Sequence, residues 1–369
     1  MKIALNCSYY GEKSGGIKEY IYNLVINLLK VDKENEYTFY VSVDDEEFWR
    51  RTMPKEAKYK IFPFKRDQQI KRSLTQDSFW RKEQQLEKFD IFHSPFFYVP
   101  KLDNCKTIMT VHDLRFRRYP NSYTFMRRHF VRYAFEKSLK FVDRIITVSE
   151  FTKSEIEAFY SYPSERIAPI LEAVNYDNFL KEVDDTSILK ELGLNKQGYL
   201  LSVGHIEPRK NYPLLIEAVD ELNKDPKYSY GLVIVGKKNY KYQDSIEAIN
   251  RSNNVKYLDF VSFDTLISLY KNALIHVFPS IYEGFGFPTL EAALFGVPSV
   301  ISNVSSLPEM GGNSAVQIDP RSKTSLINGI KEAIDRRDEL SILTKENLNR
   351  FSWSKTAEET KALYDEIVR

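Results

Sequence analysis

Two glutamates eight positions apart, Glu283 and Glu291, flank a short loop that contains two glycines. Carboxylates repel phosphates, but they are good bidentate acceptors for vicinal hydroxyl groups such as those of a sugar. Spacing alone leaves a second interpretation equally open. In that interpretation Glu291 is an ordinary acid near a helix N-terminus, and Glu283 is a solvated loop residue.

The loop between the two glutamates has the features of an anion site. Gly284 and Gly286 allow positive φ and close backbone approach, so the amides of residues 283–287 can face a ligand. A helix expected to begin at Pro288 adds about half a positive charge at its N-terminus. A ligand with phosphates in the middle and a polyol at each end, such as a nucleotide sugar, would use the whole stretch.

Apolar patterns place this loop within one strand–loop–helix–strand unit. β-Prone runs at Leu274–Phe278 and Val297–Ile301 bracket it, and Thr289–Phe295 has helical periodicity.

A pair of cations, Arg209 and Lys210, lies in a comparable loop. Tyr199–Val203 is expected to form the strand before it and Tyr212–Leu222 the helix after it. A planar guanidinium beside a compact ammonium group suits a diphosphate.

The first half carries weaker signals of the same kind. Gly15 and Gly16 separate an expected strand, Lys2–Cys7, from an expected helix, Ile17–Leu29. This arrangement also suits a phosphate, with a flexible β–α turn as the alternative. It lacks the Gly-x-Gly-x-x-Gly spacing of dinucleotide-binding folds, so a dehydrogenase is only weakly indicated.

His112 and Asp113 follow an expected strand at Lys106–Val111. Open α/β sheets bind ligands at the carboxyl ends of their strands, which makes the pair a candidate for a site. A lone histidine is nevertheless more often structural than catalytic.

Composition limits the function classes. The formal net charge of +2 gives no reason to expect a nucleic acid partner, and no apolar run approaches the length of a membrane span. Cys7 and Cys105 are far apart, and the histidines show no metal-ligand spacing. These features indicate reduced thiols, a cytoplasmic protein and no protein-bound metal.

Short apolar strands alternate with helical runs along both halves of the 369 residues, which predicts an α/β protein with two parallel, doubly wound sheets. A polar, turn-rich segment near residues 172–195 is expected to link them. We therefore expect one domain over residues 1–174 and a second over residues 175–353.

Two stretches of the first half, residues 58–82 and 115–140, each combine eight Lys and Arg residues with several aromatic residues. Such a mixture can lie on an anionic membrane surface. The alternative is a solvated helix that packs its rings inward. We favour that alternative for the first stretch. For the second the two stand evenly, and it is the stronger membrane candidate because it adjoins His112.

Residues 279–302, PSIYEGFGFPTLEAALFGVPSVIS, resemble the signature of the retaining glycosyltransferases of family four in the GT-B superfamily. Those proteins carry Glu-x7-Glu around a Gly-Phe-Gly turn. TVHDLRFRRYP, RIITVSEFTKSEI and the final FSW segment also resemble the family, so the likeness spans nearly the whole chain. It implies two Rossmann-like domains facing a central cleft. The first would bind the acceptor and the second the donor, and a C-terminal helix near residues 354–369 would return to the first domain.

The resemblance also implies roles for individual donor-site residues. Glu283 would hold the transferred sugar, Glu291 the ribose, and Arg209 with Lys210 the leaving diphosphate. Further donor contacts would come from Gly15, Gly16, Phe260, Val261, Gly284, Phe285, Gly286 and Phe287.

In the first domain, the resemblance places His112 and Asp113 beside the reacting sugar and His93 in the pocket wall. The chain departs from many relatives at His205, where they have arginine. It departs again at Glu172 and Ala173, where they have Asn-Gly.

We therefore expect a retaining, metal-independent hexosyltransferase with no cofactor besides its nucleotide-sugar substrate. GDP-mannose is the first expectation for the donor, with UDP- and dTDP-sugars open, and the acceptor is a lipid-linked or polysaccharide glycan. The expected location is the cytoplasm, with peripheral contact at the inner membrane face. The rivals are a hydrolysing nucleotide-sugar epimerase of the same architecture and a catalytically silent sugar-binding relative.

Overall fold

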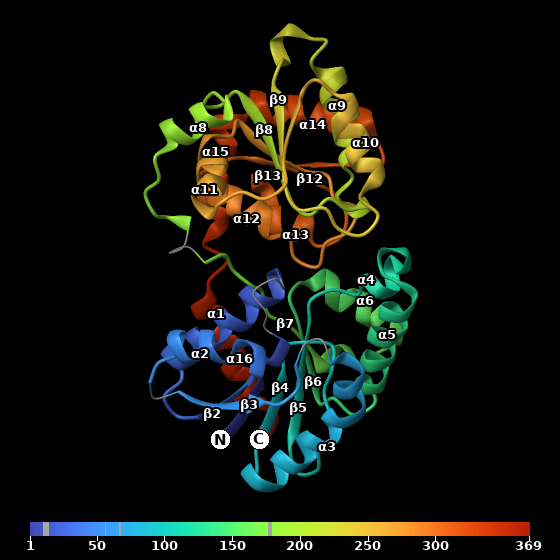
Figure 1. Cartoon of the computed structure of the whole chain (residues 1–369), viewed down its shortest axis with the longest axis vertical. Coiled ribbons are helices and arrows are strands. Elements are labelled where there is room, and N and C mark those ends of the chain that lie inside the picture. The colour runs from blue at the N-terminus through green and yellow to red at the C-terminus, as the bar shows by residue number, and fades with distance from the viewer. Residues whose placement is uncertain (10–14, 56, 66–67, 176–178) are drawn as a thin grey trace. The chain divides into compact units, whose positions relative to one another are not determined.

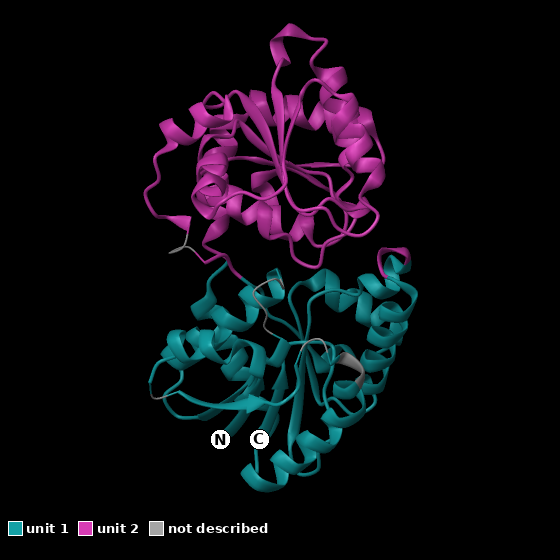
Figure 2. Ribbon diagram, in the orientation of Figure 1, with its two compact units in different colours: residues 1–120, 124–172, 351–369 teal, residues 121–123, 173–350 magenta. Residues whose placement is uncertain are grey.

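The computed structural model describes residues 1–9, 15–55, 57–65, 68–175 and 179–369, which form two compact units (Figure 2). Unit 1 comprises residues 1–120, 124–172 and 351–369, and unit 2 comprises residues 121–123 and 173–350. Residues 10–14 of the first glycine loop, Arg66 of the first basic stretch and residues 176–178 of the expected linker lie outside the described residues.

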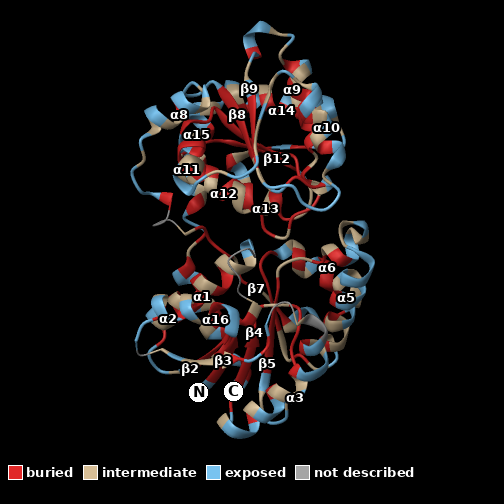
Figure 3. Cartoon of the chain, in the orientation of Figure 1, coloured by how far each residue is buried: buried red, intermediate tan, exposed pale blue. Residues whose placement is uncertain are grey.

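Unit 1 is built on a parallel sheet in the order β3-β2-β1-β4-β5-β6-β7 (Figure 1). Its strands are β1 (Lys2–Asn6), β2 (Glu36–Ser42), β3 (Lys58–Phe62), β4 (Ile91–Ser94), β5 (Lys106–Val111), β6 (Arg144–Thr147) and β7 (Ile167–Pro169). The side chains of β1, β2, β4 and β5 are buried along most of their length (Figure 3), as expected for a parallel sheet covered by helices on both faces, whereas those of the edge strand β3 are mostly half-buried.

The helices of unit 1 include a segment from the far end of the chain. They are α1 (Gly16–Val31), α2 (Glu46–Thr52), α3 (Gln69–Glu87), α4 (Arg115–Arg118), α5 (Phe125–Leu139), α6 (Glu150–Tyr160) and α16 (Trp353–Val368). Helix α16 packs against α1, and its Thr356 hydroxyl donates to the Leu171 carbonyl at 2.6 Å. The expected return of the C-terminal helix is therefore confirmed. Ser149 caps α6 by accepting from the Thr152 amide.

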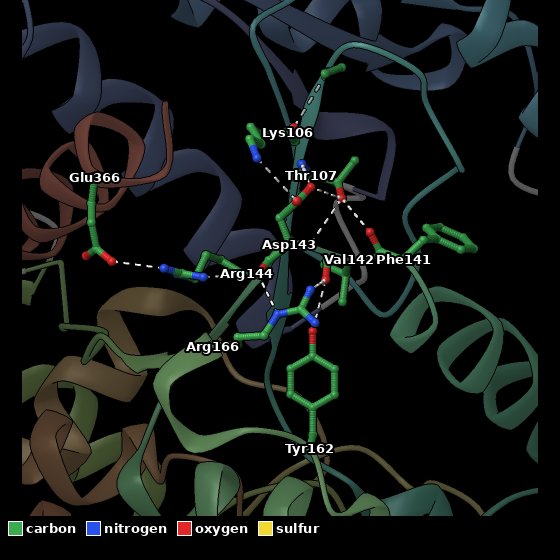
Figure 4. A network of polar contacts seen from close by, with 10 residues as sticks. Lys106, Thr107, Phe141, Val142, Asp143, Arg144, Tyr162, Arg166 and Glu366 are labelled. Carbon is green, nitrogen blue, oxygen red and sulfur yellow. Dashed lines mark hydrogen bonds and ion pairs between the residues drawn. The ribbon is translucent and has the colours of Figure 1, made fainter. Parts of the chain in front are cut away.

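Asp143 fastens the amino ends of β5 and β6 together (Figure 4). One oxygen of its carboxylate accepts from the Thr107 amide at 2.8 Å and from the Thr107 hydroxyl at 3.1 Å. Arg166 donates to the Asp143 carbonyl at 3.1 Å, and Arg144 pairs with Glu366 of α16 at 3.0 Å. Polar residues thus stabilise this edge of the sheet and leave the opposite edge, at the carboxyl ends of the strands, for ligands.

Unit 2 repeats the architecture with a parallel sheet in the order β10-β9-β8-β11-β12-β13. Its strands are β8 (Tyr199–Val203), β9 (Gly231–Val235), β10 (Val255–Leu258), β11 (Ile275–Phe278), β12 (Ser299–Ser302) and β13 (Ala315–Ile318). Its helices are α8 (Asp185–Leu192), α9 (Tyr212–Leu222), α10 (Gln243–Arg251), α11 (Phe263–Asn272), α12 (Phe287–Leu294), α13 (Leu307–Gly311), α14 (Lys323–Asp335) and α15 (Arg337–Leu348).

Each sheet has one point where the strand order reverses, between β1 and β4 in unit 1 and between β8 and β11 in unit 2. At such a switch point the loops after the two central strands run to opposite faces of the sheet and leave a crevice between them, where open α/β sheets bind ligands. In unit 2 those two loops carry Arg209 with Lys210 and Glu283 with its glycines.

Candidate functional site

The candidate site of unit 2 is formed by the loops that follow β8 and β11. Backbone hydrogen bonds join them: the Ile281 amide donates to the Arg209 carbonyl at 2.8 Å. The Gly204 amide donates to the Val235 carbonyl of β9 at 2.9 Å. The loops are therefore fixed to one another before any side chain is considered.

The Lys210 side chain packs closely against the backbone of Gly204. A Cβ on Gly204 would lie 2.9 Å from Cε of Lys210, and Gly204 has a φ of +155°, so only glycine leaves room for the lysine stem. The Lys210 ammonium lies 4.2 Å from the centroid of the Phe278 ring. The side chain is 6% exposed, so its charge is almost fully removed from water.

Glu283 receives both cations on a single oxygen. Its Oε1 lies 2.7 Å from Nζ of Lys210 and 2.5 Å from Nη1 of Arg209. Arg209 also pairs with Glu207 at 2.7 Å and donates to the Tyr282 carbonyl at 3.1 Å. The structure thus brings together Glu283, Arg209 and Lys210, as the sequence predicted.

The charges of this cluster shift one another. Burial and the adjacent Arg209 lower the pKa of Lys210 to about 8, against the opposing effect of Glu283. Burial alone would raise the pKa of Glu283, but Arg209 and Lys210 outweigh it and lower that pKa to about 2. Glu283 is therefore ionised at every physiological pH, whereas Lys210 begins to lose its proton slightly above neutrality.

Two serines hold the backbone of the glycine loop through hydrogen bonds. The Ser306 hydroxyl bonds the carbonyls of Glu283 and Phe285 at 3.0 and 2.7 Å, and the Ser305 hydroxyl accepts from the Glu283 amide at 3.2 Å. Gly286 caps α12 with a φ of +115°, and a Cβ there would lie 2.7 Å from the Leu307 side chain. Helix α12 begins at Phe287 with Pro288 in its first turn, as expected.

The remaining candidate binding residues of unit 2 lie outside the ion cluster. Glu291 is on α12, where it accepts a hydrogen bond from the Tyr270 hydroxyl at 2.6 Å rather than joining the ion cluster. Phe260 follows β10 and is 73% exposed, with the Lys237 ammonium 4.3 Å from its ring centroid. Val261 beside it is half-buried. An exposed ring next to a cation can stack on a planar ligand.

The candidates of unit 1 lie at the carboxyl ends of its own strands. Gly15 has a φ of +58° and caps α1, and Gly16 is the first residue of that helix. His112 is hydrogen-bonded to the buried carboxylate of Glu172 at 3.0 Å. Asp113 accepts from the Arg115 amide at 2.9 Å and so shapes the turn that begins α4.

Sequence reasoning missed the residues that hold the predicted ones in place. They are Glu172, Glu207, Tyr270, Ser305 and Ser306. One signal was available for Glu172, because the chain has a glutamate where many relatives have asparagine. Among the described residues, no three or more His, Cys, Asp or Glu side chains form a group that could hold a metal ion.

Comparisons with known proteins identify the family of the chain. Residues 14–178 match the family model for Glycosyltransferase Family 4, and residues 184–350 match that for Glycosyl transferases group 1. O-antigen chain mannosyltransferase B of Escherichia coli is 32% identical over 282 residues, which are 74% of this chain and 74% of that protein. The chain belongs to glycosyltransferase family 4.

Two further similarities extend the comparison. The glycosyltransferase is 32% identical over 246 residues to O-antigen chain mannosyltransferase RfbU of Salmonella typhimurium, covering 66% of this chain and 64% of that protein. The solved structure of Anabaena Alr3699/HepE in complex with UDP-glucose superposes with a TM-score of 0.72 at 16% identity, over 99% of this chain and 100% of that one. That likeness shows a common fold, and the GT-B architecture expected from the sequence is confirmed.

The pairing of Glu283 with both cations means that an incoming anion must displace a carboxylate. We expect Glu283→Gln to bind inorganic pyrophosphate roughly tenfold more tightly than the unmodified glycosyltransferase, because the amide does not compete for the two cations. Isothermal titration calorimetry at fixed pH measures this. Glu291→Gln is the matched control, since Glu291 bonds Tyr270 and should leave the affinity unchanged. Weaker binding by Glu283→Gln would contradict the arrangement.

Deprotonation of Lys210 gives a second prediction. We expect the affinity for a diphosphate diester, whose charge is constant near neutral pH, to fall as the pH rises through about 8. The loss should approach about tenfold per pH unit above that value, because the neutral amine no longer attracts the anion. Lys210→Met keeps a comparable stem without a titrating group and should bind weakly at every pH. An unmodified protein with pH-independent affinity up to about pH 9 would refute the role of Lys210.

Proposed function

We propose that this glycosyltransferase is a retaining mannosyltransferase that moves mannose from GDP-mannose to a lipid-linked or polysaccharide glycan of the O-antigen type. The observation that carries the proposal is the cluster of Glu283, Arg209 and Lys210 at the switch point of unit 2. The sugar is supported by the two similar proteins named as O-antigen mannosyltransferases. UDP- and dTDP-sugars are the alternative donors. A uridine nucleotide is included because the similar structure of Anabaena Alr3699/HepE is a complex with UDP-glucose.

The cluster suits a donor that carries a diphosphate between two polyols. The diphosphate would take the place of Glu283 on Arg209 and Lys210, and the backbone of residues 284–287 would complete its cradle. The displaced Glu283 carboxylate would then be available to the hydroxyls of the hexose. Glu291, one turn into α12, would take the ribose, and Phe260 with Val261 would lie near the base.

The proposed reaction needs no protein nucleophile. The acceptor hydroxyl attacks the anomeric carbon on the face from which the diphosphate leaves, so the configuration is retained. The bond between the anomeric carbon and the phosphate oxygen breaks, and the acceptor proton passes to that phosphate oxygen. Arg209 and Lys210 stabilise the charge that develops on the leaving diphosphate, which is the largest contribution the protein can make to such a step.

Assay of defined donors tests the proposal. The protein is incubated with GDP-mannose, UDP-glucose or dTDP-glucose, with and without a lipid-linked glycan acceptor, and both free nucleotide and extended glycan are measured. Transfer that requires acceptor supports the proposal. Nucleotide release with a new free sugar and no acceptor would identify the hydrolysing epimerase. Binding without turnover would identify the silent relative, and thermal shifts with GDP, UDP and dTDP would rank the nucleotides.

Removal of the Lys210 charge should abolish most of the activity without unfolding the protein. We expect Lys210→Ala to lower turnover by about 100- to 1000-fold, the usual loss when one group that stabilises developing negative charge is deleted. Lys224→Ala is the control, because that lysine is 72% exposed and its ammonium pairs with Glu221 at 2.7 Å on the surface. Near-normal transfer by a folded Lys210→Ala variant would count against the assignment.

We propose in addition that α5 lies on an anionic membrane surface. Four large apolar or aromatic side chains on this helix are exposed, at 71% for Phe125, 79% for Met126, 45% for Phe130 and 66% for Tyr133. Met126, Phe130 and Tyr133 fall on one helix face, whereas Arg127, Arg128 and Arg132, which alternate with them in the sequence, lie on the flanks and the opposite side of the helix. Exposed rings beside arginines suit anionic headgroups above an acyl boundary.

The other basic stretch, residues 58–82, does not share this property. Phe62 of β3 and Trp80 of α3 are fully buried, and their rings stack with centroids 5.3 Å apart, so these two aromatic side chains are not available to a membrane surface. The helices that the structure describes include none long and apolar enough to cross a bilayer. Contact with lipid would therefore be peripheral and would fall to α5.

Vesicle flotation tests the surface. We expect the protein to float with phosphatidylcholine vesicles that contain phosphatidylglycerol, but not with pure phosphatidylcholine, and to be released by salt. The double substitution Met126→Ser with Phe130→Ser should abolish flotation. Leu74→Ser with Leu86→Ser is the matched control, since those leucines of α3 are 77% and 64% exposed but lie outside α5. Equal flotation of both double variants would exclude α5 as the contact.

A further inference from the structure

His112 and Glu172 form a hydrogen-bonded pair at the carboxyl edge of the unit 1 sheet. His112 directly follows β5, and Glu172 follows β7 after two intervening residues. Nδ1 of His112 lies 3.0 Å from Oε1 of Glu172, and Nε2 lies 3.2 Å from the Pro95 carbonyl oxygen. Both ring nitrogens therefore face oxygen atoms.

The chemistry of these partners fixes the protons of the ring. A backbone carbonyl can only accept, so Nε2 of His112 must carry a hydrogen. Nδ1 then either donates to an ionised Glu172 or accepts from a protonated one. One proton is thus shared between Nδ1 and the Glu172 carboxyl group, while Nε2–H remains a donor in both cases.

Apart from the contact with His112, the Glu172 carboxylate makes few hydrogen bonds. The residue is 1% exposed, and its second oxygen, Oε2, has no hydrogen-bond partner among the described residues. Burial raises the pKa of Glu172, although the hydrogen bond from His112 opposes that shift. A glutamine would fill the same volume without a buried charge, so packing alone does not call for a carboxylate here.

Tyr20, His93 and Asp113 are other titratable side chains beside the pair. The Tyr20 ring of α1 meets the His112 ring edge-on at 4.8 Å, and its hydroxyl bonds Thr110. His93 of β4 bonds the same threonine, and burial together with the charge of His112 lowers the pKa of His93 to about 3. Burial raises the pKa of Tyr20 well above its ordinary value. Asp113, the next residue, is hydrogen-bonded to the Arg115 amide.

We propose that Glu172 is the positioning residue for His112, and that it holds the imidazole with Nε2–H ready to donate to a substrate oxygen. The bond from Nε2 to the Pro95 carbonyl is at the long end of the normal range, so a sugar or acceptor hydroxyl can replace it at little cost. The Glu172 side chain beside Nδ1 fixes the orientation of the ring. The inference rests on the proposed glycosyl transfer.

The protonation pattern can be measured without turnover. Selective ¹⁵N labelling of the five histidines and long-range ¹⁵N–¹H spectra distinguish protonated from bare ring nitrogens, and His112→Gln identifies the signals of His112. We expect a protonated Nε2 and an intermediate Nδ1 shift in the unmodified protein, which reflects the shared proton. A bare Nε2 would overturn the proposal, whether or not any variant folds.

Kinetics separate positioning from structure. We expect Glu172→Gln to lower kcat at least about tenfold with little change in the KM for the donor, because the ring loses its fixed orientation while donor binding in unit 2 is untouched. In a His112→Gln background the same substitution should cost nothing further, since Glu172 acts only through His112. Glu155→Gln is the matched control, a glutamate of α6 that is 5% exposed and pairs with Arg118 at 3.8 Å.

The outcomes are distinguishable from a failure of the proposed function. Losses that multiply in the double variant, or an unchanged kcat in Glu172→Gln, would refute the role of Glu172 while transfer itself stands. Absence of transfer by the unmodified protein with every donor would refute the proposed function. In that case the spectra still decide whether Glu172 sets the protonation of His112.

Discussion

The buried ion cluster of Glu283, Arg209 and Lys210 is the interaction on which the arrangement of the unit 2 site depends. A lysine at 6% exposure is costly unless it is paired, and its partner comes from a loop 73 residues further along the chain. The pairing therefore requires the loops after β8 and β11 to meet, which parallel strands on either side of a switch point allow. Gly204 completes the constraint, because any side chain there would occupy the path of the lysine.

The regular parts of the fold could be predicted from the sequence because their causes are local. The predicted bounds of β5, β8 and α9 coincide with those of the structure. Near-continuous apolar runs mark buried parallel strands, and Ser149 marks a helix start. The grouping of Arg209 and Lys210 with Glu283 could also be predicted, since each motif follows a strand and the resemblance assigned all three residues to one donor site.

The supporting residues could not be predicted, because their partners are set by tertiary packing. The sequence around Tyr270 does not indicate that its hydroxyl donates a hydrogen bond to Glu291. Ser305 and Ser306 likewise contact the glycine loop only because they follow β12 in the folded sheet. The contact between Glu172 and His112 could not be predicted for another reason. Strand β7 ends at Pro169, and the chain beyond it turns the glutamate toward His112.

The two units handle a buried carboxylate in the same way. Glu283 in unit 2 and Glu172 in unit 1 are each at most 9% exposed, and each is paired with cationic or proton-bearing side chains. A buried carboxylate pair is a weak source of stability, because desolvation offsets most of the attraction. Its advantage is preorganisation: the donors are oriented before substrate arrives, and binding exchanges one set of hydrogen bonds for another rather than creating order anew. Both pairs lie beyond the carboxyl ends of the strands, where open α/β sheets bind ligands, whereas Asp143 and its partners join the amino ends of β5 and β6 in unit 1.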